Sequence, residues 1–376
     1  MTVHSFSSRR LRGIVIAATL VGLSLVLSFS AAQAREPNEY EQYMVELVNR
    51  ARLDPEGEVA LLSTGSLNEG PPTLGSYPYT IPAGPKQPVA IHTEVIDAAS
   101  DYAQALNDVD QFCHSCLGSS AESRMTDAGY VPALSDFAFF SGVAGYTLAY
   151  GGAQDPGCTG GCPIYVPGRE NLSFRGEGPP NGMIDNLLAA VDQAHVGLFN
   201  DFTVPTRGHR STMMYGEWRE VGIGMNEGLD NGGSFDSLYI VQDFAHRSDV
   251  GPFLTGVAYD DVDEDGFYTP AAGEALGGVL VTVYEAGTAN LAGTATTMTA
   301  GGYKVELPVG NYDVVVSGTG ISESYTDVAI LGSGPGGIGE NTKLDFIPVP
   351  EPAMLLSLGA GSLFLAMARR RREQGC

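Results

Sequence analysis

Two residues in the stretch GHRSTMMYGEWREVGIG at 208–224 carry side chains that could do chemistry. His209 follows a glycine, and Glu220 lies eleven residues later, directly before an apolar run spaced by glycines. An imidazole and a carboxylate together can bind a divalent cation or transfer a proton. Each residue also has a structural interpretation, because His209 could begin a helix and Glu220 could be a solvated strand end. The spacing alone does not decide between these interpretations.

Four cysteines form two closely spaced pairs, Cys113-x-x-Cys116 and Cys158-x-x-x-Cys162. They could form a four-cysteine zinc site, but an oxidising compartment outside the cytoplasm favours disulfides. Local pairing would close two short loops, whereas crossed pairing would tie down the long insertion at 131–168. We favour disulfides over zinc, and the sequence leaves the pairing open.

An acidic stretch, YDDVDEDGFYTPAAGE, begins at residue 259. Asp261, Asp263 and Asp265 alternate ahead of a glycine, which is the first half of a calcium-loop pattern. The glutamate expected at the twelfth position is replaced by Ala272, and Glu274 follows two residues later. The flanking patterns are strands, which excludes a true EF-hand. A solvated acidic turn is the structural alternative.

The elements that position these residues fall into two predicted domains. Residues 36–250 show helical apolar spacing at 38–52, 91–106 and 183–199, and half-buried strands at 220–226 and 237–245. This pattern predicts an α+β domain in which helices enclose a small antiparallel sheet. Residues 254–346 consist of short alternating strands separated by turn residues, which predicts a small all-β sandwich.

Four motifs of the first domain resemble the CAP superfamily of cysteine-rich secretory, antigen 5 and pathogenesis-related-1 proteins. They are VELVNRAR at 45–52, QFCHSCLGSSAESRMTDAGY at 111–130, GRENLSF at 168–174, and the Gly-His-Arg and Glu-Val-Gly-Ile-Gly elements of 208–224. They occur in the family's order, although Arg169 stands where glycine is usual. The resemblance implies a CAP-type α-β-α sandwich.

The resemblance also implies a cleft formed by His114, Glu170, His209 and Glu220, with Asp201 as a possible extra ligand. In the family such a tetrad can bind a divalent metal, and the fold can bind lipids or other apolar ligands. Imidazole and carboxylate groups suit zinc or a similar cation, and they could also transfer protons. The sequence contains no Gly-x-Ser-x-Gly, His-Glu-x-x-His or phosphate-binding glycine motif, which weakens an enzymatic interpretation.

The second domain resembles bacterial B-type surface repeats and carboxypeptidase-regulatory-like sandwiches. The shared features are the alternating aspartates, the following Gly-Glu, and the segment GGYKVELPVGNYDVVV at 301–316. The resemblance implies that Asp261, Asp263, Asp265 and Glu274 bind calcium and stiffen the start of this domain.

Both ends of the chain have the pattern of processing signals. Residues 1–34 combine a basic start, an apolar run at 14–30 and Ala-Gln-Ala, which predicts a secretory signal peptide rather than a membrane anchor. Residues 349–372 resemble a PEP-CTERM sorting signal, with Pro-Glu-Pro, a short apolar segment and four arginines. This implies recognition by an exosortase-type enzyme and only a transient place in the membrane; a permanent tail anchor is the alternative.

The charge of the chain argues against nucleic-acid binding. Asp and Glu number 44 against 20 Lys and Arg, which gives a formal net charge of −24. Removal of both predicted signals takes away seven arginines and one glutamate, so the mature chain lies near −30. Binding to a phosphate backbone requires a basic surface, whereas an acidic surface suits cations or a basic partner.

These patterns predict an exported protein of the cell surface or extracellular matrix. The leading hypothesis is a binding module that holds a divalent, zinc-like cation, with a small or apolar ligand, a lipid or an exopolysaccharide as a further partner. One alternative is a metal-dependent hydrolase that acts on peptides or envelope material. Another is a structural matrix protein in which the cleft is vestigial.

Overall fold

The computed structural model of the protein describes residues 35–70, 73–74, 77–78, 80–131, 168–202, 204, 206–230, 232–318, 320–333 and 338–348. The described residues belong to one compact unit. Three predicted features lie outside them: the signal peptide at 1–34, Cys158 and Cys162 in the long insertion, and the sorting signal at 349–372.

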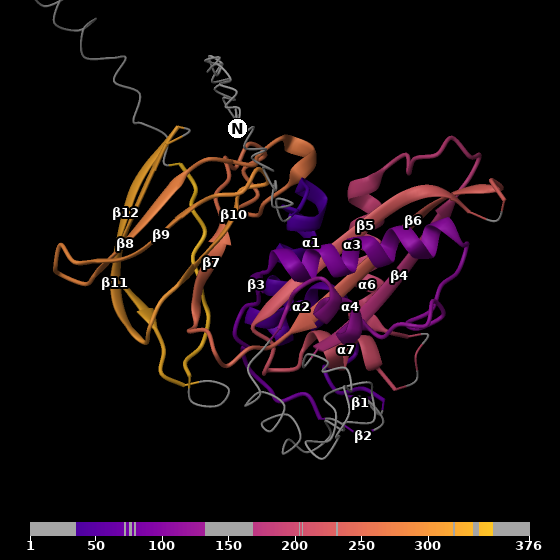
Figure 1. Cartoon of the computed structure of the whole chain (residues 1–376), viewed down its shortest axis with the longest axis horizontal. Coiled ribbons are helices and arrows are strands. Elements are labelled where there is room, and N and C mark those ends of the chain that lie inside the picture. Colours follow the sequence, from indigo (N-terminus) through magenta and orange to yellow (C-terminus); the bar gives the residue numbers. More distant parts are fainter. Residues whose placement is uncertain are drawn as a thin grey trace, which may run out of the picture. The chain divides into compact units, whose positions relative to one another are not determined.

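The first part of the chain is built on a four-stranded sheet with helices packed against it (Figure 1). In spatial order the strands are β3 (Ala90–Ile91), β5 (Glu220–Asp230), β6 (Phe235–Ala245) and β4 (Gly168–Glu177). β3 is parallel to β5, and the other two pairings are antiparallel. The helices among the described residues are α1 (Glu39–Leu53), α2 (Pro55–Leu61), α3 (Thr93–Asp108), α4 (Ala121–Asp127), α6 (Leu187–Asn200) and α7 (Gly208–Met213). A separate hairpin is formed by β1 (Thr73–Leu74) and β2 (Tyr77–Pro78).

The alternation of residues along β5 explains why helices pack on both faces of this sheet. Val221 and Ile223 are buried in the same core as α1 and α6. Gly222 and Gly224 face α3, and a Cβ at Gly222 would lie 2.2 Å from the backbone carbonyl carbon of Val95. Gly224 is equally close to the α3 backbone. The glycines therefore allow α3 to pack directly on the strand, which a larger side chain would prevent.

Helix boundaries follow their capping residues. The predicted helix at 38–52 is confirmed as α1, and the side chain of Asn38 caps it in a capping box with Glu41. The predicted helix at 183–199 begins later than expected, at Leu187. Asn186 is the reason, because its side chain accepts a hydrogen bond from a backbone N–H of the first turn and so fixes the start of the helix at the next residue.

The second part of the chain is all-β, with two sheets that share one core. One sheet has the order β12-β11-β8-β9 and the other β10-β7-β13. The strands are β7 (Phe253–Val257), β8 (Leu280–Glu285), β9 (Leu291–Thr296), β10 (Gly302–Glu306), β11 (Gly310–Gly318), β12 (Ile321–Ile330) and β13 (Thr342–Lys343), with the 3₁₀ turn η1 at Pro270–Ala272. Alternate residues of β8 and β11, such as Val281 and Val314, are fully buried against Leu254 and Tyr303 of the other sheet. The chain as a whole is therefore a mixed α/β structure with several sheets.

Residues on either side of the predicted boundary at 250–254 contribute to one buried contact. Val257 and Tyr259 belong to the same apolar core as Tyr43 and Met44 of α1. Asn341 adds polar links, because its side-chain amide donates to backbone carbonyls of the first part of the chain. The all-β part is thus packed against the helical part over both apolar and polar groups.

Candidate functional site

His114 and Glu170 form the first of two histidine–carboxylate pairs. Glu170 lies on β4 with 3% of its side chain exposed, whereas His114 lies in the loop between α3 and α4 with 55% exposed. Nδ1 of His114 is 2.8 Å from Oε1 of Glu170. The other oxygen of Glu170 accepts a hydrogen bond from Arg124 of α4. A buried, anchored carboxylate therefore orients an exposed imidazole.

His209 and Asp201 form the second pair. Asp201 ends α6 in the left-handed backbone region with φ of 52°, and its side chain is almost fully buried. His209 lies in the first turn of α7, and its Nδ1 is 2.9 Å from Oδ1 of Asp201. The backbone N–H of His209 donates to the other carboxylate oxygen over 2.9 Å. Asp201, predicted only as an extra ligand, is thus the direct partner of His209.

The two pairs are neighbours. The ring centroids of His114 and His209 are 6.4 Å apart, and the side chain of Asn171, next to Glu170, donates to the backbone carbonyl of His209 over 3.2 Å. Each imidazole contacts its carboxylate through Nδ1. Nε2 is therefore the ring nitrogen through which each histidine can bind a ligand.

Glu220, the fourth residue of the predicted set, has different partners. Tyr130 donates to one of its oxygens over 2.7 Å, and Nζ of Lys304 on β10 lies 3.1 Å from the other. Nε2 of His92 is 3.6 Å away. Burial alone would raise the pKa of Glu220, but Lys304 and His92 hold it below its ordinary value. The alternative of a solvated strand end is wrong, because Glu220 is 1% exposed.

A buried acid lies behind the first pair. Asp243 of β6 is opposite Glu170 in the sheet register and is fully buried. Burial, and then the charge of Glu170, raise the pKa of Asp243 well above its ordinary value, although Arg124 opposes this. Among the described residues neither oxygen of Asp243 has a hydrogen-bond partner. The sequence analysis did not single out Asp243 or Arg124. The one signal in the sequence was for Asp243, a carboxylate at an inward position of the apolar strand β6.

Cys113 and Cys116 form a disulfide. The local pairing, one of those the sequence left open, is therefore present, and these two sulfurs are not zinc thiolates in this structure. The disulfide closes a short exposed loop that contains His114. Cys158 and Cys162 lie outside the described residues.

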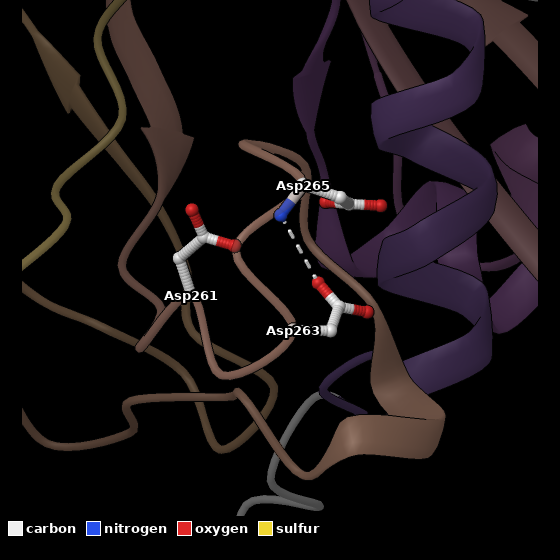
Figure 2. A group of neighbouring side chains, drawn as sticks. All are labelled: Asp261, Asp263 and Asp265. Carbon is white, nitrogen blue, oxygen red and sulfur yellow. Dashed lines mark hydrogen bonds between the residues drawn. The ribbon is translucent and has the colours of Figure 1, made fainter.

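The acidic loop of the all-β part brings three carboxylates together. Figure 2 shows Asp261, Asp263 and Asp265 on one loop, where ligand oxygens of all three lie within 4.8 Å of one another. Among the described residues, no other group of three or more His, Cys, Asp or Glu side chains has its ligand atoms this near to one another. The two histidine–carboxylate pairs therefore do not form a comparable cluster. Each of the three carboxylates also accepts a backbone N–H within the loop.

Glu274 stabilises the same loop from its inner side. It is fully buried, and its two oxygens accept backbone N–H groups of Val262 over 2.9 Å and of Thr269 over 2.7 Å. These amides lie at opposite ends of the acidic turn. Glu274, predicted as a fourth calcium ligand, therefore bridges the two ends of the loop by accepting hydrogen bonds from the loop's backbone.

Comparison with known proteins gives a match for the C-terminal segment, described below. No curated protein matches the chain. Among solved structures, the chain is similar to an outer surface protein from Borrelia burgdorferi, with 12% identity and a TM-score of 0.27 over 57% of this chain and 98% of that one. This similarity carries no argument about fold or function.

Within the described residues no helix has the length and apolar character to span a membrane.

The sorting prediction is confirmed, because residues 348–372 match the PEP-CTERM protein-sorting motif. This motif is recognised by exosortase, so the chain is an exported protein that is sorted to the cell surface.

Proposed function

We propose that this protein is a surface-delivered binding module with a CAP-type sandwich, and that its two histidine–carboxylate pairs hold a divalent cation. The observation that carries the proposal is the matched geometry of the pairs. His114 and His209 are each oriented through Nδ1 by a nearly buried carboxylate, and their rings are neighbours. A histidine that binds metal typically donates its other ring N–H to a carboxylate in this way.

The two imidazoles would supply two of the four ligands that a zinc-like ion takes. Nε2 of His114 and of His209 would be the ligating atoms, and the rings, whose centroids are 6.4 Å apart, would have to turn and move closer to present both nitrogens to one ion. Glu170 and Asp201 would fix the ring orientations and raise the basicity of the ligating nitrogens. We assign this role to Asp201 in place of Glu220, whose oxygens already contact Tyr130 and Lys304.

The first prediction concerns metal affinity. Replacement of Asp201 by asparagine is expected to weaken zinc binding about 10- to 100-fold, because partners that orient metal-binding histidines contribute on this scale. His209→Ala is expected to remove binding altogether. Isothermal titration of the purified protein with ZnCl₂ measures both effects, and metal content by mass spectrometry provides an independent readout.

His92→Ala is the matched control, since this histidine contacts Glu94 and Glu220 outside the two pairs. It should leave zinc affinity unchanged within about threefold. Equal loss in His92→Ala and His209→Ala would contradict the proposed site. Turnover of peptide or envelope material that disappears in His209→Ala would instead support a metal-dependent hydrolase, and absence of metal binding would support a structural matrix protein.

We also propose that Asp261, Asp263 and Asp265 bind calcium. The supporting observation is the convergence of three carboxylates on one loop (Figure 2); Glu274 bridges the ends of that loop. Calcium takes six to eight oxygen ligands, and carboxylates of one loop can supply several of them. The ion would offset the repulsion between neighbouring carboxylates at the start of the all-β part.

The second prediction follows from this proposal. Calcium at 100 times its Kd should stabilise the fold by about 2.7 kcal/mol, because a ligand that binds only the folded state shifts unfolding by mass action. Thermal unfolding in CaCl₂ and in a chelator measures the difference. Asp263→Asn should reduce it, whereas Asp313→Asn, in β11 outside this loop, should not. A calcium effect of the same size in Asp263→Asn would overturn the assignment.

A further inference from the structure

The disulfide between Cys113 and Cys116 is placed differently from a buried structural bridge. Cys116 and the two residues between the cysteines are exposed, and Cys113 is half-buried. Cys113-x-x-Cys116 spacing favours rapid formation and opening of a disulfide, since the two sulfurs stay close in both states. An external thiol can therefore approach the exposed residue Cys116 without unfolding of the protein.

The loop also contains a group that stabilises one sulfur as a thiolate. The backbone N–H of Cys116 points at Sγ of Cys113 over 2.9 Å. A hydrogen bond to the leaving sulfur lowers the energy of the thiolate that forms when the disulfide opens. Cys113 is thus the better leaving group, and the exposed Cys116 is the better target of attack.

The two halves of the loop are held differently. The hydroxyl of Tyr102 on α3 donates to the backbone carbonyl of Cys113 over 2.6 Å, and Arg124 donates to the carbonyl of His114 over 3.3 Å. These bonds tie the first half of the loop to α3 and α4. The disulfide provides the covalent link that ties the second half, at Cys116, to the first.

We propose that Cys113–Cys116 is an exchange-active disulfide that a dithiol reduces, and that its opening frees the second half of the loop, at Cys116, beside the His114–Glu170 pair. One thiolate of the dithiol attacks Sγ of Cys116, the sulfur–sulfur bond breaks, and its electron pair leaves on Sγ of Cys113. The second thiolate then attacks the mixed disulfide and displaces Cys116. The protein gains two electrons and two protons, and the dithiol becomes a disulfide. The exchange requires no metal, so it is independent of the proposed cation site.

Native-state reduction tests the exchange. The folded protein is treated with dithiothreitol in the presence of a chelator, quenched by alkylation and mapped by peptide mass spectrometry, which separates this pair from the other cysteines. The rate constant in the folded state is expected to lie within about tenfold of that in the urea-unfolded chain, because access and not unfolding limits attack. Circular dichroism should remain unchanged. Reduction that occurs only with loss of the folded signal would overturn the proposal.

The second readout is the position of His114. Its ring resonances in NMR spectra should shift on reduction, and Cys116→Ser should reproduce the shifted resonances without any reductant. The resonances of His209 act as the internal control, since Asp201 and α7 hold that ring independently of the disulfide. Resonances of His114 that are identical in the oxidised, reduced and Cys116→Ser forms would refute the release of the loop beside it, whatever the outcome of the zinc titrations.

Discussion

Replacement of Lys343 by methionine is expected to lower the free energy of unfolding by about 3–5 kcal/mol, the usual cost of leaving one buried charge without its partner. Nζ of Lys343 on β13 lies 2.8 Å from Oε2 of Glu46 on α1, and it also contacts Asp345. Burial alone would lower the pKa of Lys343, but Glu46 and Asp345 raise it above its ordinary value. The ammonium group is therefore charged, and its loss would strand a Glu46 side chain that is 2% exposed.

The double variant Lys343→Met/Glu46→Gln distinguishes the stranded charge from lost packing. Removal of both charges should recover most of the stability, because a buried pair contributes little relative to neutral groups of similar size. Urea unfolding of the two single variants and the double variant gives the coupling energy. Additive losses across this cycle would show that the ion pair does not hold the all-β part against α1.

Replacement of Glu58 by glutamine is expected to cost about 3 kcal/mol at neutral pH, because a pKa lowered from 4.5 to about 2 in the folded state corresponds to a stabilisation of that size. Glu58 of α2 is buried and accepts a two-point contact from Arg50 at 2.8 and 2.9 Å. Nε2 of His195 on α6 lies 2.8 Å from the same carboxylate. Burial opposes ionisation of Glu58, yet Arg50 and His195 outweigh it and lower the pKa to about 2.

The pH dependence of this variant follows from the sign of the shift. A carboxyl group with a depressed pKa in the folded state contributes stability that is complete above its ordinary value of 4.5 and is lost as the pH falls towards 2. Protonated glutamate resembles glutamine, so the difference in the free energy of unfolding between the wild-type protein and Glu58→Gln should disappear between about pH 4.5 and pH 2. Urea midpoints at pH 7, 4 and 2.5 measure this. A difference in the free energy of unfolding that stays constant with pH would show that the lost stability does not come from the ionised Glu58 carboxylate.

Local patterns in the sequence were sufficient for several features of the fold. Asn38 and the apolar spacing after it predicted α1, since a cap and a periodic stripe are properties of a few consecutive residues. The alternation of apolar and polar residues predicted β5, β6 and an all-β part of the chain after residue 254. The boundary of α6 was missed by a few residues, because Ile184 and Leu187 share the apolar stripe while only Asn186 supplies the cap.

The candidate site depended on information that local patterns lack. The resemblance placed His114, Glu170 and His209 in one region, and the structure brings these three together. It could not separate Asp201 from Glu220 as the acid beside His209. That choice depends on the left-handed end of α6, which directs Asp201 towards α7, and on Lys304, which arrives from the all-β part and engages Glu220.

By itself the sequence determined the sorting signal, the succession of helical and all-β parts, and the residue types available for a cation site. These depend on consecutive residues, whose composition and periodicity act locally. Only the tertiary structure decided the partners: Asp201 for His209, Lys304 for Glu220, and Cys116 for Cys113. Partner choice is a matter of which buried charge lies within a few ångströms of another, and that distance is set by packing between segments far apart in the chain.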